Sequence, residues 1–152
     1  MTRAISPVLG VVLVLVMTIT LSATLLSGIS ISVPDPSPTA SFDISADGST
    51  NEIELSHHGG DAIDVSNLDV RVRIDGTELH NQPPVPFFAA DGFESGPEGA
   101  FNSASDNILR AGEATSFRLA ETNSPQLQAG SEVAVQITAG NTVIYDEKTT
   151  AT

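Results

Sequence analysis

Three histidines are the side chains in this sequence best suited to bind a transition metal. His57 and His58 stand close to Asp61, and His80 follows further along the chain. Adjacent residues on a strand point to opposite faces, so His57 and His58 cannot readily serve one ion. We therefore interpret them as exposed residues beside a Gly-Gly turn, and we predict no metal site.

An acidic and hydroxyl-rich segment, residues 47–52, resembles a calcium-binding loop in composition only. It lacks the order of acidic residues and glycine that an EF-hand loop requires. Clustered carboxylates would hold cations loosely in salt, but the sequence predicts no dedicated calcium site and no cofactor.

No arrangement of residues indicates catalysis. The sequence has no G-x-S-x-G nucleophile elbow, no H-E-x-x-H motif and no glycine-rich loop that would cradle a phosphate. No N-x-[ST] sequon occurs either, because the hydroxyl residues after Asn102 and Asn141 come one position too early. The chain is predicted not to be an enzyme.

The charge of the 152-residue chain is strongly acidic, with 19 acidic and 6 basic residues, and cysteine is absent. All 19 acidic residues lie from Asp35 onward, together with five of the six basic ones. Such a surface repels phosphates, so we expect no nucleic-acid partner. Two explanations of the acidity stay open. One is solubility through self-repulsion. The other is a halophilic setting, which the single lysine, Lys148, and the abundant aspartate favour.

The amino-terminal segment has the opposite character, because residues 4–34 contain no ionisable side chain. A helix over residues 7–28 would be about 33 Å long, close to the ~30 Å hydrocarbon core of a bilayer. Ser6 could cap such a helix, and Pro7 is tolerated at its first position. The sequence therefore predicts a long hydrophobic helix over residues 5–31, which spans a membrane or fills the core of a filament.

Small hydroxyl residues form two rows on this helix. Thr20, Thr24 and Ser27 make one row, and Thr18 and Ser22 make the other. Two interpretations stay open: small residues let helices approach closely, or the hydroxyls bond to carbonyls of their own helix.

Three identities compete for the apolar segment. A secretory signal peptide has a shorter apolar core, and residues 28–30 make a poor cleavage site. A plain membrane anchor fits the length but does not explain the opening residues. Those residues, Ser6-Pro7-Val8-Leu9-Gly10 after Arg3-Ala4, favour a third identity.

At this opening the sequence resembles the archaeal type IV pilin family, whose members begin with a short basic leader and a Ser-Pro-Val-Ile-Gly-like motif. Leu9 stands where isoleucine is commoner, and Ala4 stands where many members have glycine. The resemblance covers about the first thirty residues. It implies that a prepilin peptidase removes residues 1–4 by cutting Ala4–Ile5, with Arg3–Ala4 as the alternative bond.

The resemblance also implies what becomes of the mature chain. It would wait in the membrane as a single-pass precursor, and assembly machinery would add it to a homo-oligomeric helical filament at the cell surface, a pilus rather than an archaellum, with a role in adhesion. Bacterial-type pilins carry a glutamate at the fifth mature position. Here that position is Leu9, so packing alone would set the register of the helices.

Beyond a proline-rich linker at residues 32–41, the pattern changes to the period of two that is typical of strands. The clearest strand is residues 68–75. Asp75-Gly76 and Gly140-Asn141 are predicted as tight turns, and residues 91–106 as a long loop. Further strands are expected around residues 42–44, 53–55, 77–80, 115–119, 132–138 and 142–146, with weaker ones at 62–65 and 84–88. The predicted fold class is therefore α+β and pilin-like: a long hydrophobic helix followed by an acidic, all-β, immunoglobulin-like sandwich over residues 42–152.

The alternative function is a monomeric, membrane-anchored, extracellular β-sandwich module that binds a solute or a partner. The two functions differ in the fate of residues 1–4, which only a filament subunit would lose.

Overall fold

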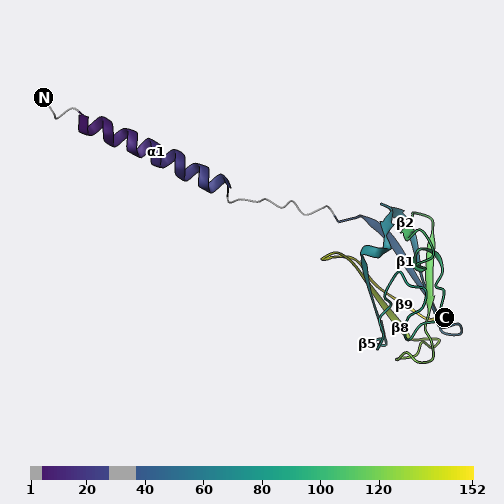
Figure 1. Cartoon of the computed structure of the whole chain (residues 1–152). Helices are drawn as coiled ribbons and strands as arrows, with labels where there is room; N and C mark the ends of the chain where they lie inside the picture. The colour runs from purple at the N-terminus through teal and green to yellow at the C-terminus, as the bar shows by residue number, and fades with distance from the viewer. Residues whose placement is uncertain (1–4, 28–36) are drawn as a thin grey trace. The chain divides into compact units, whose positions relative to one another are not determined.

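The computed structural model describes residues 5–27 and 37–152, and within the helix it describes the side chains of residues 7–22. The chain divides into two units, Met1–Asp35 and Pro36–Thr152, which are described separately below. Figure 1 shows the elements of both units.

The first unit contains α1, Ile5–Ser27. The helix begins at Ile5, so Ser6 and Pro7 lie in its first turn, and Ser6 is not the residue that precedes the helix as predicted. Proline is tolerated there, because the N–H groups of a first turn have no partner within the helix.

The predicted fold class is wrong in its helical part. No helix in the described residues is both long enough and apolar enough to cross a membrane.

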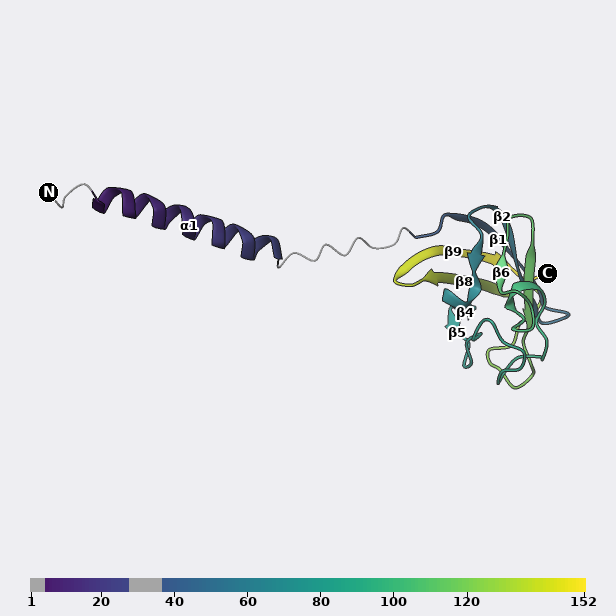
Figure 2. The same cartoon turned by 45° about the horizontal axis from the view of Figure 1, so that its top comes forward.

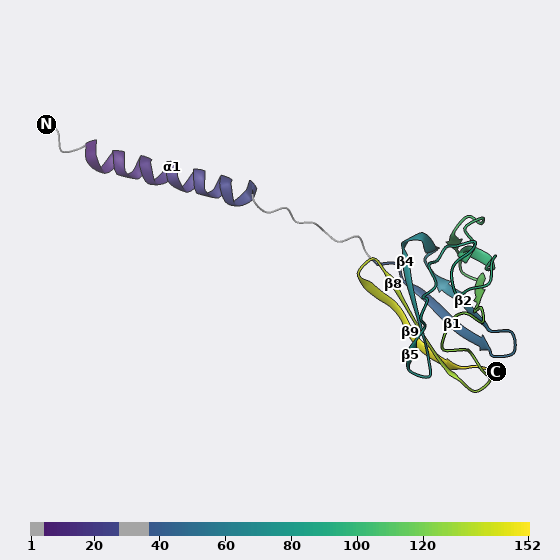
Figure 3. The same ribbon diagram turned by 60° about the horizontal axis from the view of Figure 1, so that its bottom comes forward.

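The second unit contains nine strands: β1 Ala40–Asp47, β2 Glu52–Gly60, β3 Ile63–Asp64, β4 Leu68–Ile74, β5 Thr77–Glu78, β6 Ile108–Leu109, β7 Ala114–Arg118, β8 Glu132–Ala139 and β9 Thr142–Thr150. They form three sheets, in the orders β1-β2-β7, β3-β6 and β5-β4-β8-β9, and every strand pair is antiparallel. The predicted immunoglobulin-like, two-sheet arrangement is therefore replaced by mostly antiparallel strands in three sheets. Figure 3 shows β1 and β2 on one side of the unit and β4, β8 and β9 on the other.

Two tight turns follow the sequence prediction. Asp75 and Gly76 join β4 to β5 with φ angles of 51° and 79°. Positive φ at both positions is the geometry of a type I′ turn, whose twist matches that of the strands it joins. Gly140 and Asn141 join β8 to β9, the hairpin drawn in yellow in Figure 2.

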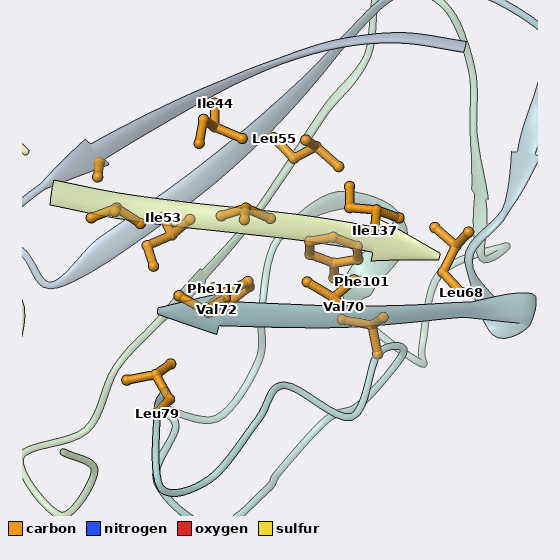
Figure 4. Packing of buried hydrophobic residues seen from close by; sticks show 14 of the residues in the cluster. Ile44, Ile53, Leu55, Leu68, Val70, Val72, Leu79, Phe101, Phe117 and Ile137 are labelled. Carbon is orange, nitrogen blue, oxygen red and sulfur yellow. The ribbon is translucent and has the colours of Figure 1, made fainter. Parts of the chain in front are cut away.

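The hydrophobic core lies between the three-stranded and four-stranded sheets. Alternate residues of the long strands point inward, as in β4, where Leu68, Val70, Val72 and Ile74 are buried. Figure 4 shows side chains from both sheets, among them Ile44 and Val70, directed into one interior. The strict alternation in β4 is why its sequence gave the clearest strand signal.

The predicted long loop, residues 91–106, is anchored to this core. It contains a short 3-10 turn, Gly99–Phe101, and its Phe93 and Phe101 are buried. The buried Thr115 of β7 fixes it: the hydroxyl donates to the Glu98 carbonyl at 2.6 Å and accepts from the Phe101 amide at 2.9 Å. The weaker strand predicted at residues 84–88 is absent from the described strands, and only Phe87 forms an isolated bridge there, with Asn102.

Candidate functional site

The surface of α1 is the largest exposed apolar area in the described residues. The large apolar side chains between Val8 and Leu21 are each 53% to 67% exposed. A helix that is apolar on every side is normally buried, and an exposed apolar patch of this kind marks an interaction site. The first candidate site is therefore this helix surface.

A groove follows one side of α1 and has a volume of about 610 Å³. Its lining residues recur at helical spacing: Pro7, Gly10, Val11, Val14, Leu15, Thr18 and Ile19. A Cβ built on Gly10 would meet no atom within 4 Å, so no contact inside the chain requires glycine there. Gly10 instead leaves a notch, which a side chain of a neighbouring helix could enter.

The hydroxyl rows on α1 bond to their own helix. Thr18 donates to the Val14 carbonyl at 2.7 Å, and Ser22 donates to the Thr18 carbonyl at 2.8 Å. Thr20 donates to the Val16 carbonyl at 3.0 Å. These three hydroxyls therefore support the interpretation that the hydroxyl rows bond to carbonyls of their own helix. Their hydrogen-bonding capacity is used within α1. The side chains of Thr24 and Ser27 lie outside the described residues.

The predicted processing residues fall at the edge of the described structure. Arg3 and Ala4 lie outside the described residues. Ile5 and Ser6 belong to the first turn of α1, but their side chains are not among those described. Pro7 and Gly10 both line the groove, so the structure brings together these two members of the predicted helix-start motif. Helical spacing in the sequence was the signal that could have identified the rest of the groove.

The histidines are arranged differently from the prediction in one respect. His57 is 1% exposed, not exposed as predicted, because β2 turns it inward to stack on Phe42 with ring centroids 5.0 Å apart. Its Nε2 lies 2.9 Å from the Gly59 carbonyl, and its Nδ1 has no hydrogen-bond partner. His58 and His80 are exposed. Within the described residues, no group of three or more histidine, aspartate or glutamate side chains could hold a metal ion.

The segment with a calcium-loop composition forms the turn between β1 and β2. Asp47 accepts hydrogen bonds from the Ser49 amide at 2.7 Å and the Ser49 hydroxyl at 2.6 Å. The bond from the Ser49 hydroxyl, and to a lesser degree the bond from the Ser49 amide, lowers the pKa of Asp47. The carboxylate therefore stabilises its own turn, as aspartates in this position commonly do.

The described helix and strands define a class of protein: a chain with an amino-terminal apolar helix and a separate domain of mostly antiparallel sheets. No family model matches it. Over 120 residues the chain is 30% identical to a protein of Archaeoglobus fulgidus described as an uncharacterized protein, and the match covers 77% of this chain and 73% of that relative. The chain belongs to the same family as that protein.

Proposed function

We propose that the chain is a structural subunit of a type IV pilus-like filament at the cell surface, assembled from many copies through α1, with adhesion as its role. A prepilin peptidase and an assembly machinery would act on it before it joins the filament. The acidic β domain would face the medium, where its excess of carboxylates keeps it soluble.

One observation carries the proposal. The apolar side chains of α1 are more than half exposed on every side of the helix. In water this surface must be covered, and copies of the same helix can cover one another when their apolar faces and grooves interlock. The groove at Gly10 and the absence of charge between residues 4 and 34 support such helix-on-helix packing.

The experiment that tests the proposal is amino-terminal sequencing of filaments sheared from the cell surface. We expect the mature chain to begin at Ile5, because the opening residues resemble a prepilin cleavage junction. A start at Ala4 would still be peptidase processing, at the alternative bond. An intact Met1 or Thr2 start on the surface protein would overturn the proposal and favour a membrane-anchored monomer.

A matched variant tests the junction directly. Ala4→Gln places a long side chain at the predicted bond, and we expect unprocessed chain and few filaments. The control Thr2→Gln makes a similar change two residues away and should leave processing unaltered.

A further inference from the structure

The edge of β1 that faces β9 is a stretch of sheet edge in the β domain that is left open. β7 is covered on its outer side, because the amide of Glu98 donates to the Ser116 carbonyl at 2.9 Å. β4 is covered by β5 and by Gln82, whose Oε1 accepts from the Val72 amide at 2.7 Å. The edges of β1 and β9 face each other, and in the described residues backbone hydrogen bonds join them only through Thr152. Open edges are uncommon in natural proteins, since they invite pairing with another strand.

The join is made by Thr152. Its amide donates to the Ala46 carbonyl at 3.0 Å, and its carbonyl accepts from the Gly48 amide at 3.0 Å. Towards the other end of the two strands, no backbone hydrogen bond in the described residues links residues 40–44 of β1 to residues 145–149 of β9. A groove of about 390 Å³ lies there, lined by both strands.

The backbone of β1 points into this groove. His57, the partner of Phe42 in β2, uses its amide and carbonyl for bonds to Glu113 and Gly112. Phe42 therefore directs its own amide and carbonyl away from β2, and Ile44 does the same two residues later. On β9 the Ala151 amide points away from the groove, because it donates to the Ser131 carbonyl. Backbone groups alternate in direction along a strand, so the amide and carbonyl of Lys148, three residues earlier, point towards the groove.

The side chains around the groove give it a negative charge. Asp43 and Glu147 belong to no ion pair among the described residues, and both contribute to the raised pKa of Tyr145. Lys148, the basic residue of the groove, is engaged with Glu132 at 2.8 Å. The floor is closed by the edge-to-face contact of Phe42 and Tyr145, with ring centroids 5.7 Å apart.

We propose that this edge binds an extended polypeptide segment that carries basic side chains, supplied by a partner other than this chain. The partner's backbone would pair with β1, as in recognition by strand addition, and its cations would lie against Asp43 and Glu147. A second copy of this chain does not fit, because every basic side chain of the described β domain already has a carboxylate partner: Arg71, Arg73, Arg110, Arg118 and Lys148.

The test uses the full chain in detergent micelles and a short fluorescent peptide of alternating valine and lysine, with binding followed by anisotropy. The double variant Asp43→Asn, Glu147→Gln should weaken binding about tenfold, as expected for the loss of two exposed ion pairs. The control Glu54→Gln, Asp146→Asn removes the same charge outside the groove and should change binding by less than about twofold.

A second pair of peptides separates strand pairing from simple charge attraction. A peptide of alternating proline and lysine keeps the charge but loses half of its amide donors, so it should bind at least about tenfold more weakly. Equal binding of both peptides, or an equal effect of the two double variants, would overturn the proposal. Either result would mean that the anionic surface attracts any cation. Failure of this test would leave the assembly of filaments through α1 unaffected.

Discussion

Tyr145 is the titratable residue of the β domain whose pKa is shifted most clearly by its environment. Partial burial, followed by the negative charges of Asp43 and Glu147, raises its pKa from 10.0 to about 12. It is the only tyrosine, and the chain has no tryptophan, so its ionisation can be observed without interference.

We predict that Tyr145 keeps its proton in the folded protein until pH values near 12. Below pH 10 the hydroxyl is protonated in both states. Above that value the unfolded chain loses the proton first, so the free energy of unfolding falls as the pH rises from 10 to about 12. Tyrosinate absorbance during an alkaline titration, together with urea unfolding at each pH, measures both effects.

Tyr145→Phe serves as the control for this prediction. It removes the ionisable hydroxyl and keeps the ring against Phe42, so this component of the pH dependence should disappear. In Asp43→Asn the pKa of Tyr145 should move down towards 10.0. A wild-type titration near the ordinary tyrosine value would contradict the environment described.

At the scale of elements, α1 exposes an apolar surface: its large apolar side chains from Val8 to Leu21 are each more than half exposed. Leu15 and Gly10 both line its groove. A Cβ built on Gly10 would meet no atom within 4 Å, so the chain itself has room for a larger side chain there, which would narrow the groove.

We predict that Gly10→Leu prevents filament assembly, because the added side chain fills the notch that a neighbouring helix would occupy. Leucine is a better helix former than glycine, so loss of helix could not explain the defect. The control Val12→Leu adds one methylene at a position that does not line this groove. Electron microscopy of cells that express each variant measures the outcome, and filaments formed normally by Gly10→Leu would exclude this groove as the helix contact.

At the scale of the whole molecule, charge is the dominant feature. The chain has 19 acidic and 6 basic residues, and the described ion pairs are largely exposed, so each contributes little to stability. Repulsion among unpaired carboxylates therefore outweighs attraction within the ion pairs. Added salt should reduce this repulsion by more than it weakens the ion pairs.

We predict that the free energy of unfolding of the β domain increases as potassium chloride rises from about 0.1 M to about 1 M, because the Debye length shortens from about 10 Å to about 3 Å. Thermal unfolding followed by circular dichroism measures it. A triple variant, Asp91→Asn, Glu94→Gln, Glu121→Gln, neutralises exposed carboxylates that have no described ion pair and should be less dependent on salt. Stability that does not change with salt would remove the halophilic interpretation.

Strands that alternate regularly could be predicted from the sequence. β4 and β8 were predicted from their period of two, and the turns at Asp75-Gly76 and Gly140-Asn141 from residue types that are typical of tight turns, of which Asp75, Gly76 and Gly140 have positive φ. These features are local: one strand face or one turn is fixed by a few neighbouring residues. The opening motif from Arg3 to Gly10 is equally local, and it remains the sequence basis of the proposed processing.

Features that depend on contacts between separate segments could not be predicted without the three-dimensional structure. His57 is buried because β2 lies against β1 and Phe42 covers its ring. The 91–106 loop is held in place because the Thr115 hydroxyl of β7 forms hydrogen bonds with its backbone. The open edge beside Asp43 and Glu147 exists because Thr152 joins β1 to β9 at one end alone. No periodic pattern encodes these contacts, since they depend on how separate segments pack, at sequence separations from 14 residues for Phe101 and Thr115 to 106 residues for Ala46 and Thr152.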